Sequence, residues 1–466
     1  TINISIQVIG GNKMEELRVL VPNGMLGYGF PLEDFERGMK RQPHGIVVDA
    51  GSTDSGPQKL ALGEMTCPES AYYKELSVLV PAAKKAGIPL IVSSAGGDGT
   101  NQHVDLFIKI VEQIANEQEL SINLAKIYSD IPKKQIDSAL QDGKITAMQN
   151  VPELTQEEVD QTTVVTAQMG AEPYLTLLKA EKKPDVIIGG RTYDPAPTAA
   201  LGMYYGFDSA LAWHMGKIIE CGAICCVPAG KTVLGTLRSD HFLIEPMNLD
   251  AKALPHTVAA HTMYEKSSAF NLPGPGGTLN LEECEFKAET DRTTRISGSR
   301  FIKDENYMVK LEGAKVVGYR SITVMGVRDP ILISQMDEAL AYVKEQMEKE
   351  LPEECSQSQI IFHPYGKNAT MKNLESLTDE AGHEMCVIAE VAAPTQEMAQ
   401  LVVNRIRTTL LHYGYPGRVA TSGNIGMPFT PLEIPLGKVC QFNVYHLLKI
   451  EEPVAQFPVI MQEVGK

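Results

Sequence analysis

The sequence predicts an α/β protein with three parts: an N-terminal half built on a parallel sheet, a β-rich insert, and a ferredoxin-like α+β domain. Up to about residue 235, short apolar runs alternate with amphipathic helical patterns, which favours a parallel sheet covered on both faces. From about residue 236, short alternating segments between polar turns indicate antiparallel strands. The last third follows the order strand, helix, strand, strand, helix, strand, which is typical of a ferredoxin-like domain.

The length and net charge of the chain limit which classes of protein it can belong to. A chain of 466 residues is long for one core, so we expect domains at 1–235, 236–312 and 313–466. A net charge of −16 disfavours binding to nucleic acid or to an anionic membrane. No run of eighteen apolar residues occurs, so no membrane span is expected. Eight cysteines without a CxxC pair indicate a reduced, cytoplasmic protein.

The N-terminal half is expected to contain strands and helices in alternation. The first strand is TINISIQVIGGNK, and later strands are expected at 45–52, 88–97, 123–132 and 183–197, with helices at 69–87, 104–118 and 133–143. Ligands of such sheets lie beyond the carboxyl ends of the strands. The turns at 49–56, 94–101 and 189–195 should therefore line one rim.

The remainder is expected to be strand-rich and then α+β. TLRSDHFLIEP and CEFKAETDRTTRISGSRF contain antiparallel strands, and PGPGG (273–277) is a rigid loop between them. The C-terminal helices are expected in ILISQMDEALAYVKEQMEKEL and TQEMAQLVVNRIRTTLLHYG. The tail, LGKVCQFNVYHLLKI, fits a closing strand or a helix.

The turn SAGGDGTN (94–101) follows an apolar strand and precedes a helix. Backbone N–H groups in such a turn form an anion site, so we expect Gly96, Gly97, Gly99 and Thr100 to bind substrate and Asp98 to move a proton. The same string also resembles the phosphate loop of lipid and NAD kinases, although no second nucleotide motif accompanies it. A plain turn is the remaining alternative.

GGRTYDPAP (189–197) places two glycines, Arg191 and Asp194 after a strand. Arginine suits bidentate binding of a carboxylate, and Asp194 could move a proton. The alternative is an Arg–Asp pair that fixes the loop.

DAGSTDSGP (49–57) offers two carboxylates at a strand end. Asp49 and Asp54 could hold Mg²⁺, and Ser52 and Thr53 could contact substrate. Turn chemistry explains the same residues. No other cofactor is expected.

Two further segments carry candidate residues. His214, in the helix AWHMGKIIECGAICC (212–226), could transfer a proton, although a core histidine is an equal alternative. Tyr264 and Glu265, in HTMYEKSSAFNLPGPGG (261–277), could form a pocket wall. A short helix with exposed polar residues is the alternative there.

Taken together, DAGSTDSGP, DVIIGGRTYDPAP, HMGKIIECGA, YEKSSAFNLPGPGG and GYRSITVMGVRDP resemble the acyclic terpene utilisation (AtuA-like) family. The resemblance implies an α/β N-terminal half, a ferredoxin-like C-terminal region and a role in breaking down small organic acids. It also implies that the Asp98–Gly99–Thr100 extension varies an existing Gly-Gly turn, which argues against a kinase.

The expected function is a cytosolic catabolic enzyme that acts on a small organic acid or its thioester by proton transfer, as a lyase, hydratase or isomerase. The alternatives are a phosphotransferase that uses the GGDGTN loop and a non-catalytic subunit of a multi-protein enzyme. The expected partners are a small carboxylate substrate, further copies of the chain in a homo-oligomer and, as the resemblance implies, a small partner subunit.

Overall fold

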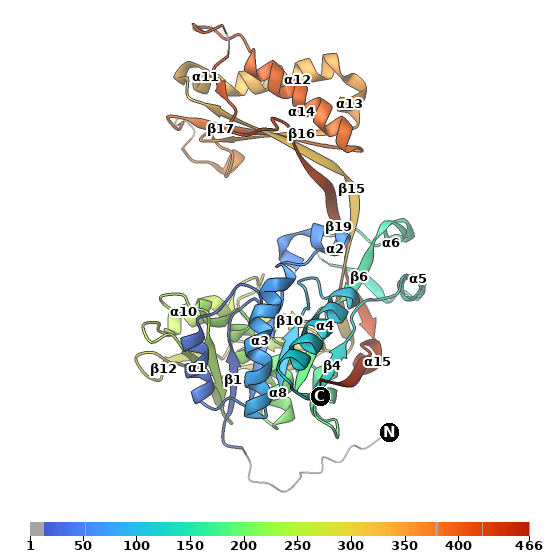
Figure 1. Cartoon of the computed structure of the whole chain (residues 1–466), viewed down its shortest axis with the longest axis vertical. Helices are drawn as coiled ribbons and strands as arrows, with labels where there is room; N and C mark the ends of the chain where they lie inside the picture. The colour runs from blue at the N-terminus through green and yellow to red at the C-terminus, as the bar shows by residue number, and fades with distance from the viewer. Residues whose placement is uncertain (1–13, 52, 149, 378–380, 422, 466) are drawn as a thin grey trace. The chain divides into compact units, whose positions relative to one another are not determined.

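The computed structural model describes residues 14–51, 53–148, 150–377, 381–421 and 423–465. The expected first strand, at 1–13, lies outside these residues. The chain divides into two compact units, Thr1–Ala314 with Phe442–Lys466, and Lys315–Gln441. Figure 1 shows the elements of both units.

A mixed ten-stranded sheet forms the centre of the first unit, in the order β12-β13-β9-β8-β1-β2-β3-β7-β4-β20. Its middle five strands are parallel: β1 (Leu17–Val21), β2 (Gly45–Asp49), β3 (Leu90–Ser93), β7 (Val186–Gly189) and β4 (Ile122–Ile127). The runs GIVVD, LIVS and VIIG are fully buried, as expected for strands covered on both faces.

Antiparallel strands extend the sheet at both edges. One edge carries β8 (Val233–Leu237), β9 (His241–Pro246), β13 (Thr294–Ser297) and β12 (Glu285–Ala288), and the other carries β20 (Val459–Val464). A separate three-stranded sheet contains β10 (Asn271–Gly274), β11 (Gly277–Asn280) and β14 (Arg300–Lys303). The expected antiparallel strands after residue 236 are therefore present, and several of them join the main sheet.

Helices cover both faces of the parallel strands. Side chains alternate across a strand, so Ile46 and Val48 pack with α3 (Glu69–Ala86) and α4 (Asn101–Glu117) in one core cluster, whereas Val47 lies in the cluster with α7 (Glu172–Leu178), α8 (Ala196–Tyr204) and α9 (Ser209–Ile219). Figure 1 shows α3 and α4 together in front of the sheet. The other helices of this unit are α1 (Leu32–Lys40), α2 (Pro57–Leu62), α5 (Lys133–Gln141), α6 (Gln156–Gln161), α10 (Pro255–Thr262) and α15 (Pro453–Gln456), with 3-10 turns η1 (Thr53–Ser55) and η2 (Gly222–Cys225).

The second unit contains an antiparallel sheet with helices. Its strands β16 (Gln359–Tyr365), β17 (Met385–Ala393), β15 (Tyr307–Val327) and β19 (Ile434–Ile450) lie in that order, so the C-terminal tail is a strand. Alternate residues of β17 are buried, and they pack in one core with α12 (Met336–Glu350) and α14 (Gln396–Leu411). The remaining elements here are α11 (Pro330–Ser334), α13 (Pro352–Ser356), η3 (Lys372–Leu374) and β18 (Ile425–Gly426).

Both long strands of that sheet, β15 and β19, also have a part in the first unit. There Leu311–Ala314 pairs with β6 (Val164–Ala167), and His446–Leu448 pairs with β5 (Ile145–Ala147). The protein is thus a mixed α/β protein with a mixed main sheet and an antiparallel second sheet. Among the described residues, no helix is both long and apolar enough to cross a lipid bilayer.

Candidate active site at the carboxyl ends of the parallel strands

The three polar turns expected at one rim do meet there. Strands β2, β3 and β7 are neighbours and run parallel, so their carboxyl ends share one edge of the sheet. Asp49 pairs in register with Ser93 and accepts a hydrogen bond from its hydroxyl at 2.8 Å. The Ser94 N–H donates to the Gly190 carbonyl at 3.1 Å. Turns that are far apart in the sequence therefore converge at this edge of the sheet.

Glycine lets these turns approach one another closely. A Cβ atom at Gly51 would lie 2.4 Å from the Gly97 Cα, and one at Gly99 would lie 2.2 Å from the Arg191 nitrogen. The N–H groups of Gly97 and Gly99 donate to the carbonyls of Ser94 and Ala95. These two amides are thus used inside the loop, and Gly96 has a positive φ of 73°. The GGDGT string primarily allows close packing of loop against loop.

The carboxylate of Asp98 has partners within its own loop and helix. Its Oδ1 accepts from the Thr100 N–H at 2.9 Å and lies 2.6 Å from His103 Nδ1. The other ring nitrogen of His103 lies 3.2 Å from the Gly63 carbonyl. Because a carboxylate and a carbonyl both accept, both ring nitrogens donate and the imidazole is charged. Burial lowers the pKa of His103, but Asp98 raises it above the ordinary value.

A second carboxylate lies at the start of the same helix. Asp130 accepts from the Asn101 N–H at 3.0 Å, in the first turn of α4, where the helix dipole favours negative charge. Burial, together with the charge of Asp98, raises the pKa of Asp130 to about 6. The backbone N–H groups at the N-terminus of α4 therefore already donate hydrogen bonds to carboxylates of the protein.

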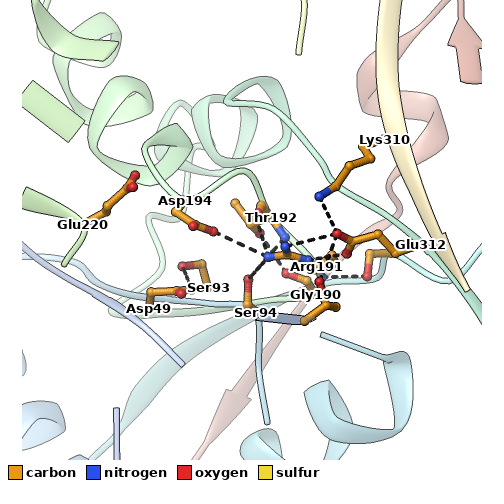
Figure 2. Close-up of polar contacts among 12 residues, drawn as sticks. Asp49, Ser93, Ser94, Gly190, Arg191, Thr192, Asp194, Glu220, Lys310 and Glu312 are labelled. Carbon is orange, nitrogen blue, oxygen red and sulfur yellow. Dashed lines mark hydrogen bonds and ion pairs between the residues drawn. The ribbon is translucent and has the colours of Figure 1, made fainter. Parts of the chain in front are cut away.

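Arg191 is held by protein groups on every side (Figure 2). Its Nε donates to Glu312 Oε2 at 2.6 Å, and its Nη1 donates to the Thr192 carbonyl at 3.1 Å and to Ser94 Oγ at 3.4 Å. Asp194 Oδ1 lies 3.5 Å from Nη1. These contacts join Arg191 to Asp194 and Glu312, as in the Arg–Asp pair that the sequence left as an alternative.

Glu312 comes from β15, far along the chain, and is fully buried. Lys310, two residues before it, approaches Oε1 at 2.6 Å, and Thr53 donates its hydroxyl to the same oxygen at 3.1 Å. Burial raises the pKa of Glu312, but Arg191 and Lys310 lower it more, to about 2. Thr53, which the sequence predicts to contact substrate, is thus hydrogen-bonded to this ion pair.

Asp194 lies on the other side of Arg191, toward Asp49 and Glu220 in Figure 2. Its side chain is 25 % exposed, whereas Asp49 and Glu220 are buried. Burial and the charge of Asp194 together raise the pKa of Asp49 well above its ordinary value. Of the three carboxyl residues Asp194, Asp49 and Glu220, Asp194 is thus the one that solvent reaches.

Helix α9 supplies the opposite charge. Asp208 caps its first turn by accepting from the Leu211 N–H at 3.0 Å, and three-residue spacing puts Lys217 and Glu220 on one side of its last turn. Lys217 Nζ lies 2.5 Å from Glu220 Oε1, and both side chains are buried. Burial raises the pKa of Glu220 to about 7; Lys217 opposes this shift and Asp194 adds to it.

The segment after α10 contributes a second lysine, Lys266, to this cluster. Lys266 donates to the hydroxyl of Tyr193 at 3.2 Å and lies 5.1 Å from the centre of that ring. Burial lowers its pKa, Lys217 lowers it further, and Glu220, Asp194 and Glu265 raise it. The rim therefore carries two lysines among carboxyl groups, of which Asp49 and Glu220 have raised pKa values.

The expected wall residues lie beside this cluster. Lys217 Nζ is 5.7 Å from the centre of the Tyr264 ring, and Glu265 acts electrostatically on Lys266. Apolar surface adjoins Lys217: a narrow cavity of about 10 Å³, which would hold about one water molecule, is lined by Trp213, Leu272, Leu279 and Phe301.

His214 lies in other surroundings. Its ring nitrogens contact Ser299 Oγ at 2.8 Å and Thr262 Oγ1 at 3.3 Å, and its ring meets Phe242 and Phe286 edge-on. Burial alone lowers its pKa, to about 3. These contacts match the core histidine that the sequence left as the alternative.

Of the two candidate metal ligands, Asp49 and Asp54, the structure describes the side chain of Asp49. Asp49 is bonded to Ser93, and no group of three or more His, Cys, Asp or Glu side chains suited to a metal is found among the described residues. Ser52 lies outside those residues, and so does the side chain of Asp54.

Sequence reasoning missed Glu312, Lys310 and Lys266 and did not select Lys217 or Glu220 as site residues. Glu312 follows apolar residues in an ordinary strand pattern, YMVKLEGAKVV, and no local motif distinguishes a buried glutamate there. The three-residue spacing of Lys217 and Glu220 in an apolar helix was the one usable signal.

Fold and site define a mixed α/β protein with a charged cluster at the carboxyl edge of its parallel strands. Residues 53–231 match the model of the acyclic terpene utilisation family protein AtuA. The match confirms the family resemblance over these residues, which carry Arg191, Asp194, Lys217 and Glu220. No curated protein and no solved structure matches the chain significantly.

Proposed function

We propose that the protein is an enzyme of acyclic terpene breakdown that moves a proton on a small organic acid or its thioester. The observation that carries the proposal is the cluster in which Asp194, partly exposed, lies among buried Asp49, Glu220 and Lys217 and half-buried Lys266. Groups with displaced pKa values gather at functional sites, and this cluster lies where ligands of such sheets bind.

Each side chain has a role that its surroundings support. Lys217 and Lys266 bind the substrate carboxylate or the enolate oxygen that develops in the reaction. Asp194 accepts the proton because it is the accessible carboxylate. Glu220, with a pKa near 7, can donate one at neutral pH. Arg191 is a positioning residue, because its contacts are with protein groups.

The chemistry resembles other enzymes in which two carboxyl groups take opposite roles because their surroundings differ. It is a lyase, hydratase or isomerase step that needs no redox group. A hydrocarbon chain on the acid is proposed from the family description alone, because the apolar cavity beside Lys217 would hold about one water molecule.

The phosphotransferase alternative has less support. Asp98 and Asp130 already accept from the amides at the start of α4, and their charge disfavours phosphate at that turn. We further infer that Lys315–Gln441 is a ferredoxin-like unit, because α12 and α14 separate strands that lie in the order β16-β17-β15-β19.

The test is hydrogen exchange from D₂O into 3-methylbut-2-enoate and its coenzyme A thioester, followed by proton NMR. Wild-type protein should exchange protons at carbons next to the carbonyl or double bond. Asp194→Asn and Glu220→Gln should each lower the rate by about 10²-fold or more. Glu283→Gln, in an exposed ion pair with Arg300, is the matched control. Exchange that survives both site variants would overturn the proposal.

A further inference from the structure

A cavity of about 660 Å³ lies at the carboxyl end of β4, and this volume is in the range of small-molecule sites. Every residue that lines it belongs to the first unit. One wall comes from the turn after β4 and from α5, and the other comes from the end of β19 and from α15. Asp194, Lys217 and Glu220 do not line this cavity, so it is distinct from the cluster proposed for proton transfer.

Asp130 lines the cavity and is held in place by Asn101. Its Oδ1 accepts a hydrogen bond from the Asn101 N–H at 3.0 Å. In return, Asn101 Oδ1 accepts from the Asp130 N–H at 3.2 Å and from the Ser129 N–H at 3.0 Å. These reciprocal bonds fix the carboxyl group and use one of its two oxygens.

The other oxygen, Asp130 Oδ2, remains available to a ligand. It has no hydrogen-bond partner among the described residues, and it is not one of the unpaired atoms that are closed off from solvent. Asp98 raises the pKa of Asp130 and His103 lowers it, but no lysine or arginine in the described part of the chain forms an ion pair with Asp130. Because an ionised carboxyl group that is partly buried gains most from a charged donor, a cation is the partner that fits it.

The charges around the cavity point to the same kind of ligand. The lining contains four carboxyl residues and two lysines: Asp130, Asp142, Glu451, Glu452, Lys144 and Lys449. Lys144 lies 3.6 Å from both Asp142 and Glu451, so one lysine is shared by two carboxylates. The excess of negative charge repels anions and attracts cations.

Part of the cavity surface is apolar. Ala139, Leu448 and Ile450 line it with buried side chains, and Pro132, Ala455 and Pro458 add further apolar atoms. A hydrocarbon chain that covers these residues gains free energy by leaving water. The ligand that fits best therefore combines a positive charge with a short hydrocarbon chain.

We propose that this cavity binds a small organic cation of the alkylammonium class. The ammonium group donates to Asp130 Oδ2, and the hydrocarbon chain packs on Ala139, Leu448 and Ile450. This is a second ligand site in the first unit, for a basic molecule rather than an organic acid, and it does not depend on the proposed function.

The test compares three probes with the same hydrocarbon chain and different charge: n-butylammonium, butan-1-ol and butyrate. Ligand-observed NMR titration of the whole chain at pH 8, where the carboxyl group is ionised and the amine is protonated, gives each Kd. Wild type should bind n-butylammonium at least about tenfold more tightly than butan-1-ol and should bind butyrate more weakly still.

The chain offers matched variants. Asp130→Asn keeps Oδ1, the acceptor for Asn101, but removes the charge, so the affinity for n-butylammonium should fall about tenfold and that for butan-1-ol should not change. Asp137→Asn is the control, because Asp137 lies on α5 but accepts from Gln156 instead of lining the cavity. Ala455→Trp, at an exposed lining position, should weaken both ligands by filling the cavity.

Four results would overturn the proposal: equal affinity of wild type for the amine and the alcohol, a preference for the amine that Asp130→Asn leaves intact, tighter binding of butyrate than of the amine, or no binding of n-butylammonium at about 10 mM. Tighter binding of butyrate would make the cavity a site for acids. These measurements are independent of proton exchange at Asp194 and Glu220, so this inference and the proposed function can fail separately.

Discussion

Arg191 Nε and Glu312 Oε2 lie 2.6 Å apart although 121 residues separate them in sequence, and both side chains are almost completely buried. The pair joins the turn after β7 to strand β15. Breaking a buried pair leaves one charge uncompensated, which costs far more than losing an exposed pair.

Arg191→Met should therefore lower the free energy of unfolding by about 3–5 kcal/mol. Urea denaturation at pH 7 measures the change. Arg238→Met is the control, because Arg238 and Glu16 form a pair that is partly exposed, and it should cost about 1 kcal/mol or less. An Arg191→Met protein as stable as wild type that had lost anion binding would instead make Arg191 a direct substrate ligand.

Asp49 and Glu312 are both buried carboxyl groups, but replacement by an amide should change the free energy of unfolding differently at the two positions. Burial and the charge of Asp194 raise the pKa of Asp49 well above its usual value, which disfavours its ionised form, so Asp49→Asn should cost less stability at pH 7 than Glu312→Gln. The pKa of Glu312 is lowered to about 2. Its contribution is full above pH 4.5 and is lost as pH falls toward 2, so Glu312→Gln should cost about 3 kcal/mol at neutral pH.

The check is the unfolding free energy from pH 7 to pH 3. Wild type should lose stability below pH 4.5, and the Glu312→Gln variant should lose less over the same range. Equal costs of the two amide substitutions at pH 7 would contradict the opposite directions of the two pKa shifts.

The framework of the first unit was readable from sequence because strongly apolar strands alternate with helices that have clear stops. GIVVD and VIIG are short, and Gly87 ends α3 with φ of 65°. Placement of the turns followed from the topology of parallel strands. The addition of β9, β12 and β13 to the main sheet was not readable, because edge pairing depends on tertiary contacts rather than on local pattern.

The site was only partly predictable for the same reason. Asp194 and Arg191 lie in a polar turn directly after an apolar strand, and this position made both residues predictable as site residues. Glu312 is 118 residues beyond Asp194, and its importance comes from burial beside Arg191. His214 has an environment of aromatic rings and hydroxyls that helical spacing alone could not distinguish from the surroundings of Lys217.

His214 should make the protein sensitive to mild acid. Its pKa is lowered to about 3 by burial, whereas an unfolded histidine titrates near 6.5. The unfolded state binds the proton first, so stability falls as pH decreases below 6.5, by about 2 kcal/mol at pH 5. Thermal unfolding of wild type and His214→Gln between pH 7 and pH 5 measures this slope, which the variant should reduce and the exposed His256→Gln should not. An unchanged slope in His214→Gln would mean that this imidazole is solvated.

The loop that resembles a kinase motif yields the last prediction. Asp98 binds its own His103 and the Thr100 N–H, so Asp98→Asn should destabilise the protein by about 1–3 kcal/mol through the loss of a buried charged partner. Millimolar ATP with Mg²⁺ should leave the melting temperature of wild type unchanged, since a ligand at a hundred times its Kd would add about 2.7 kcal/mol. An ATP-dependent rise in melting temperature that Asp98→Asn abolished would restore the phosphotransferase alternative, because it would show that the carboxylate serves a nucleotide–metal complex rather than the histidine.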